Sequence, residues 1–214
     1  MLFIYTNFIL HVINITLYLW RLPVLVRPLK FVGPYVLLTA LCEAVAAYLM
    51  FNGSRNNLFI FHVLTPLQYT LLSCIIIYAS NNINLKKMII LSIPIFILVS
   101  VLITINIQNY EKYNSVALSI QNVLVATWTV LYVKELVTRE EYVRIESDPM
   151  FYISVGLLVY SSGKFTIEGI MNYLIDKDIE LAEDLYLITI MLSFLLYIMF
   201  MAAFLCNTVS ENKY

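Results

Sequence analysis

Apolar runs of about 20 residues alternate along the chain with short polar or charged connections. At about 1.5 Å of rise per helical residue, such a run matches the roughly 30 Å hydrocarbon core of a bilayer. A segment in lipid must satisfy its backbone hydrogen bonds internally, and these runs lack the ten-residue alternation of a membrane β-barrel. We therefore expect an all-α polytopic transmembrane bundle of about seven helices in a single domain, 1–214, with spans at 2–20, 31–51, 58–79, 88–105, 114–133, 149–175 and 185–206.

The composition supports a membrane protein and argues against nucleic acid as a partner. Hydrophobic residues make up 61% of the 214 positions and charged residues only 13%, about half the charged fraction of a soluble domain. The net charge of −1 leaves no basic stripe for nucleic acid. The three cysteines lie within apolar runs at spacings that match neither a redox pair nor a zinc site, so we expect no metal and no cofactor. The first run lacks the features of a signal peptide and is expected to be retained.

Lysine and arginine are distributed unevenly between the two sides of the predicted bundle. Because cytoplasmic loops of membrane proteins are enriched in these residues, the side with nine of them is predicted to be cytoplasmic. The N-terminus is then outside, the C-terminus inside, and the acidic segment 176–184 outside. The nine are Arg21, Arg27, Lys30, Lys86, Lys87, Lys134, Arg139, Arg144 and Lys213, against Arg55, Lys112 and Lys177 on the other side.

Polar side chains inside the predicted spans gather in their outer and middle parts. Such side chains are costly in lipid, so they face the interior of a bundle and often mark binding sites. Helical spacing places Asn7, His11 and Asn14 on one face of the first span. The shared depth predicts a polar pocket that faces outward. Its candidate ligand-binding residues are His11, Glu43, His62, Gln68, Tyr69, Asn122, Lys164 and Glu168, with Pro66 and Gly163 as hinges.

Each of these features also has a purely structural interpretation. Lys164 and Glu168, one helical turn apart, can form a neutralising ion pair. Glu43 can be a protonated carboxyl that is hydrogen-bonded to a neighbouring helix. Stripes of Ser, Thr and Asn commonly mediate packing between membrane helices. Pro66 can kink its helix without binding anything.

The residues disfavour catalysis and favour ligand binding. A zinc hydrolase needs about three protein ligands, whereas the spans contain two histidines and no aspartate. No GxSxG or HExxH motif is present. We prefer a binding or sensory module that takes a small molecule from outside and signals through a separate membrane protein. Its basic cytoplasmic loops would meet anionic lipid or that partner.

Transport and scaffolding are the alternatives. A secondary transporter could be built as 3+1+3 helices, with Glu43–Tyr48 faintly repeated in Glu168–Tyr173. The stretch 65–68 (TPLQ) resembles the proline–glutamine signature of small seven-helix sugar and amino-acid carriers, although it occurs here once and in the third span. The topology resembles that of retinal photoreceptors, but the last span lacks their lysine. A scaffold subunit of a membrane complex is the third possibility.

Two stretches, 61–72 (FHVLTPLQYTLL) and 148–163 (DPMFYISVGLLVYSSG), resemble those of small seven-helix bacterial membrane proteins that have no established activity. The resemblance extends over nearly the whole chain. It implies a bacterial inner membrane and implies nothing about mechanism.

Overall fold

Seven long helices make up most of the computed structural model, which describes the backbone of residues 2–53, 56–138 and 148–206 and the side chains from residue 6 onward. Six stretches, which contain α2 to α7, are long and apolar enough to cross a membrane, and α1 adds 20 residues. The predicted all-α bundle of seven helices is confirmed. The helices are α1 (Leu2–Arg21), η1 (Leu22–Val24), η2 (Arg27–Phe31), α2 (Val32–Phe51), α3 (Phe59–Ala79), α4 (Ile83–Ile103), η3 (Thr104–Gln108), α5 (Ser115–Thr138), α6 (Pro149–Lys177) and α7 (Ile179–Leu205).

Two helices begin earlier than the apolar runs predict. α4 begins at 83 rather than 88, and α7 begins at 179 rather than 185. In each case a side chain caps the first turn: Asn82 accepts hydrogen bonds from two backbone N–H groups of α4, and Asp178 accepts one from α7. An N-cap stabilises polar first turns that hydropathy alone assigns to a loop. These two helices therefore extend beyond the predicted starts of their spans by about one helical turn or more.

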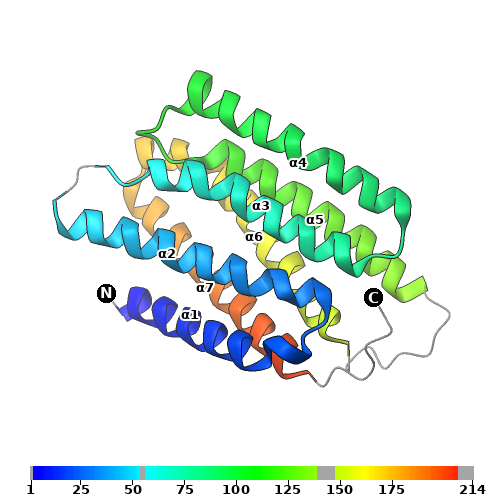
Figure 1. The fold of residues 1–214 in the computed structure, drawn as a ribbon. Helices are drawn as coiled ribbons and strands as arrows, with labels where there is room; N and C mark the ends of the chain where they lie inside the picture. The colour runs from blue at the N-terminus through cyan, green and yellow to red at the C-terminus, as the bar shows by residue number, and fades with distance from the viewer. Residues whose placement is uncertain (1, 54–55, 139–147, 207–214) are drawn as a thin grey trace.

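Six of the helices form a ring, and the seventh lies outside it (Figure 1). Around the ring, each helix packs against the next in the order α1, α2, α3, α5, α6, α7, and α7 packs against α1. α4 packs against α3 and α5 and leaves an apolar face exposed that includes Ile90, Leu91 and Leu98. An exposed apolar face of this kind is suited to contact with lipid.

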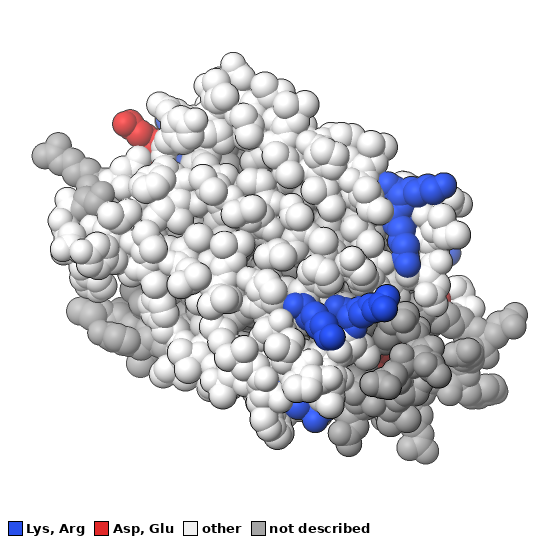
Figure 2. Space-filling view, viewed as in Figure 1, with Lys and Arg blue, Asp and Glu red and all other residues white. Residues whose placement is uncertain are grey.

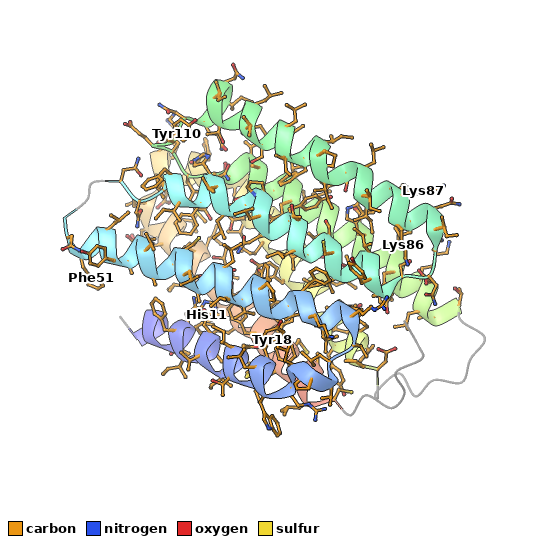
Figure 3. The ribbon with its side chains drawn as sticks, in the orientation of Figure 1. His11, Tyr18, Phe51, Lys86, Lys87 and Tyr110 are labelled. Carbon is orange, nitrogen blue, oxygen red and sulfur yellow. The ribbon has the colours of Figure 1, made fainter. Side chains whose placement is uncertain are left out.

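The two ends of the bundle differ in charge (Figures 2 and 3). Lys86 and Lys87 lie at one end, which we call the basic end, and Phe51 and Tyr110 lie at the other, which we call the Tyr110 end. Figure 2 shows blue basic side chains toward the basic end and an almost uncharged surface between the two ends. An uncharged band bounded by charged ends is what a bilayer requires of a spanning protein.

The main hydrophobic core fills the half of the ring nearer the basic end. Its members come from the start of α2, the end of α3, the end of α5, the start of α6 and the end of α7, and they include Tyr35, Ile76, Tyr132, Ile153 and Phe200. Toward the Tyr110 end the described residues form a second, smaller cluster, with four buried apolar residues on α6 and α7. Packing is therefore dense in one half of the bundle, and the other half has room for a cavity.

Candidate functional site

A cavity of about 740 Å³ lies inside the ring toward the Tyr110 end. Its walls come from the start of α1, the later part of α2, the first half of α3, the start of α5 with the connection before it, the later part of α6 and the first half of α7. The volume is within the range of small-molecule sites in proteins. The lining is mostly apolar, with polar groups at a few points: Asn7, Thr39, Glu43, Asn57, Thr65, Gln68, Tyr113, Tyr160, Lys164, Glu183, Asp184, Tyr186, Thr189, Ser193 and Tyr197.

One wall carries the Glu43 carboxylate. Asn7 donates a hydrogen bond to Glu43 Oε2 at 2.6 Å, and His11 Nε2 lies 3.1 Å from the same oxygen. His11 is buried and packs edge-on against the ring of Tyr197, with ring centroids 4.6 Å apart. The Glu43 side chain remains 28% exposed. One oxygen is thus fixed by α1, and the carboxylate can still accept a hydrogen bond from a molecule in the cavity.

The opposite wall carries a buried ion pair on α6. Lys164 Nζ lies 3.3 Å from Glu168 Oε1, and the Glu168 side chain is fully buried. The same ammonium group donates to the Tyr160 hydroxyl at 3.4 Å and lies 5.1 Å from the centre of that ring. Tyr113 approaches Glu168 from the connection before α5, and burial, followed by the nearby Glu168 carboxylate, raises the pKa of its phenol well above the usual value.

Three of the eight predicted ligand-binding residues line the cavity. They are Glu43, Gln68 and Lys164. Two others stand directly behind this lining: His11 contacts Glu43, and Glu168 pairs with Lys164. Gln68 donates a hydrogen bond to the Thr39 hydroxyl at 2.9 Å, which fixes its amide where the cavity meets the packed half.

The other three predicted residues lie elsewhere in the bundle. Tyr69 accepts a hydrogen bond from Trp128 Nε1 at 3.0 Å and contacts Ser92 Oγ at 2.5 Å, so it joins α3, α4 and α5. Asn122 is buried on α5. His62 joins the Thr104 hydroxyl, at 2.9 Å, to the backbone oxygen of Lys112, at 3.0 Å. These contacts position helices and a connection rather than the cavity.

The two predicted hinges lie in continuous helices. α3 runs through Pro66 and α6 runs through Gly163 without interruption. A Cβ atom added at Gly163 would lie 2.5 Å from Leu192 Cδ1, so this glycine lets α6 and α7 approach closely. Whether either position bends during function remains a prediction.

The predicted ligand-binding residues did not include four tyrosines of the cavity. Tyr113, Tyr160, Tyr186 and Tyr197 all line it. Tyr160 precedes Lys164 by one helical turn, and this spacing could have identified it. Tyr186 and Tyr197 share a helical face with Thr189 and Ser193, which also line the cavity, and that polar stripe could have identified them.

Comparisons of the chain with known protein families, with curated proteins and with solved structures found no match. Among the residues whose side chains are described, no group of three or more His, Cys, Asp or Glu could hold a metal ion. The case for a function therefore depends on the geometry of the cavity.

Proposed function

We propose that this chain is a multi-pass protein of a bacterial inner membrane that binds a small molecule from outside in the cavity of its helical ring. Binding at the Tyr110 end would be reported at the basic end to a separate membrane protein. The proposal places the N-terminus outside, in accordance with the excess of lysine and arginine on the other side.

The observation that carries the proposal is the uneven filling of the ring. The half near the basic end is packed with large apolar side chains, whereas the half near the Tyr110 end contains a partly open cavity of about 740 Å³ lined by Glu43, Lys164 and four tyrosines. Protein interiors are normally close-packed, and a void costs stability. A large cavity with a few convergent polar groups is the usual form of a ligand site.

The helices that line the cavity also offer a route to the basic end. α6 and α7 pack closely along their length, at Gly156 against Met199 and at Gly163 against Leu192. The end of α7 is held by Arg21, which donates a hydrogen bond from Nε to the backbone oxygen of Phe204 at 3.1 Å. A ligand that moves α7 would therefore strain or release this contact with the end of α1. Signal transmission requires an element with two states, and in this proposal the contact between Arg21 and the end of α7 is that element.

Transport is the second candidate, because the cavity lies between two sets of three helices. α1, α2 and α3 contribute Asn7, Glu43 and Gln68, while α5, α6 and α7 contribute Leu118, Lys164 and Tyr186, and α4 lies outside both sets. This agrees with a 3+1+3 construction. The continuous course of α3 and α6 and the packed half of the ring give less support to a route through the membrane.

A ligand screen with cavity-filling variants tests the proposal. A compound at 100 times its dissociation constant should raise the free energy of unfolding by about 2.7 kcal/mol, measured as a thermal shift of protein in nanodiscs. Ala47→Trp fills the cavity and should abolish this response. Ile90→Trp, on the exposed face of α4, is the matched control and should retain it.

Two results decide between the alternatives. If no compound in a broad screen of metabolites stabilises the wild type, or if Ala47→Trp responds like the wild type, the cavity is not a ligand site and the proposal fails. If a compound binds and also accumulates inside sealed proteoliposomes that contain the protein, the function is transport. Binding without accumulation supports the sensory function.

A further inference from the structure

The charges around the cavity indicate which ligand it takes. Three carboxylates line it, those of Glu43, Glu183 and Asp184, and Lys164 is the one cation among the described lining residues. From this balance we propose that the ligand is a small organic cation, an amine with an apolar body, whose ammonium group pairs with Glu43. The inference rests on the proposed ligand-binding function and specifies its chemistry.

Lys164 does not offset the charge of Glu43. Its ammonium group is already paired with the fully buried carboxylate of Glu168 at 3.3 Å, and it also contacts the hydroxyl and the ring of Tyr160. A lysine and a glutamate in contact have no net charge together. The wall on α6 is therefore neutral, and the carboxylate of Glu43 on α2 is the unbalanced charge inside the cavity.

His11 does not neutralise Glu43 either. The imidazole is 1% exposed, its Nε2 faces Glu43 Oε2, and its Nδ1 is buried with no hydrogen-bond partner. A protonated imidazole would leave a buried N–H donor unpaired, which is costly. The arrangement fits a neutral imidazole that donates from Nε2, as Asn7 donates from its amide. In this arrangement both groups donate to the carboxylate, and neither brings a positive charge to it.

Tyrosine rings complete a site suited to a cation. Tyr113, Tyr186 and Tyr197 line the cavity together with Glu43. The face of a tyrosine ring attracts an ammonium group, most strongly where water is excluded. The remaining lining is apolar and includes Leu64, Met171 and Ile190, which would contact the body of the ligand.

The acidic residues at the start of α7 favour entry of a cation. Glu183 and Asp184 line the cavity near the start of the helix, and Glu180 lies one turn before Asp184. Carboxylates grouped where a cavity opens raise the local concentration of cations and lower that of anions. The same sign of charge thus occurs at the start of α7 and at Glu43.

Three indole compounds that differ in one group test the inference. Tryptamine carries an ammonium group, tryptophol a hydroxyl group and indole-3-propionate a carboxylate, on the same apolar ring. Binding is measured by calorimetry with protein in phosphatidylcholine nanodiscs, and empty nanodiscs correct for partition into lipid. We expect tryptamine to bind at least about tenfold more tightly than tryptophol, since a close charge pair typically exceeds 1.4 kcal/mol in such sites. Indole-3-propionate should not bind.

Two variants test whether Glu43 is the residue that pairs with the ammonium group of tryptamine. Glu43→Gln should weaken tryptamine at least about tenfold and leave tryptophol unchanged, which also shows that the variant is folded. Glu111→Gln, on an exposed acidic residue outside the lining, should bind both as the wild type does. Equal binding of tryptamine and tryptophol, unchanged tryptamine binding by Glu43→Gln, or no binding of any of the three overturns the inference. The ligand-binding function then still stands if the broad screen yields a neutral or anionic compound that Ala47→Trp excludes.

Discussion

Replacing Lys164 with methionine is expected to lower the free energy of unfolding by about 3–5 kcal/mol. Methionine keeps much of the volume but removes the ammonium group 3.3 Å from Glu168. Glu168 is fully buried, so its carboxylate would lose its compensating charge. Thermal unfolding of purified protein, followed by loss of the monodisperse peak in size-exclusion chromatography, measures the effect.

The double variant shows whether the two residues act as a pair. Lys164→Met combined with Glu168→Gln removes both charges, and we expect its stability to return to within about 1 kcal/mol of the wild type. Glu168→Gln alone should cost less than Lys164→Met, because Lys164 is 16% exposed and lines the cavity. If the double variant is less stable than Lys164→Met, the pair does not stabilise the bundle in this way.

Replacing Gly156 with alanine is expected to destabilise the protein by about 1–3 kcal/mol through overpacking. The added Cβ would lie 2.8 Å from Met199 Cβ and 3.2 Å from Leu196 Cδ1, and the Cβ of Met199 cannot move without moving α7. Alanine is the better helix former by about 1 kcal/mol. A net loss of stability would therefore show that close contact between α6 and α7 outweighs helix propensity.

Gly169 is the matched control on the same helix. Its nearest neighbour, Ser119 Oγ, would lie 3.5 Å from an added Cβ, which is an ordinary contact. Gly169→Ala should therefore leave the unfolding temperature unchanged or raise it. If both alanine variants shift the unfolding temperature equally and in the same direction, close packing at Gly156 is not the cause of the change in stability.

The number and type of helices could be predicted from the sequence, because the requirement of a bilayer for apolar runs dominates local preferences. The apolar runs did not locate the helix ends that a polar side chain decides. α4 and α7 begin well before the apolar runs, because the side chains of Asn82 and Asp178 cap their first turns. Capping depends on one side chain and a few backbone N–H groups, and a hydropathy average cannot detect it.

The candidate site could be predicted only in part. Helical spacing placed Asn7 and His11 on one face of α1, and the structure brings that face to Glu43. The predicted depth of a residue in the membrane did not show which other residues it contacts. His62 lies at a depth similar to that of the cavity residues, but it faces the connection that contains Lys112. Which face of a helix meets the ring depends on contacts between helices, and no single span encodes them.

Reagent access from outside tests the central claim, that the cavity opens to the exterior, most directly. Cysteines are introduced singly in a variant in which Cys42, Cys74 and Cys206 are replaced by alanine. Ser193→Cys lies in the cavity, and Lys87→Cys lies at the basic end. Intact cells are treated with a small, membrane-impermeant methanethiosulfonate that carries a trimethylammonium group. We predict that Ser193→Cys is modified in intact cells and Lys87→Cys only after permeabilisation. Modification of Lys87→Cys but not Ser193→Cys in intact cells would contradict the account.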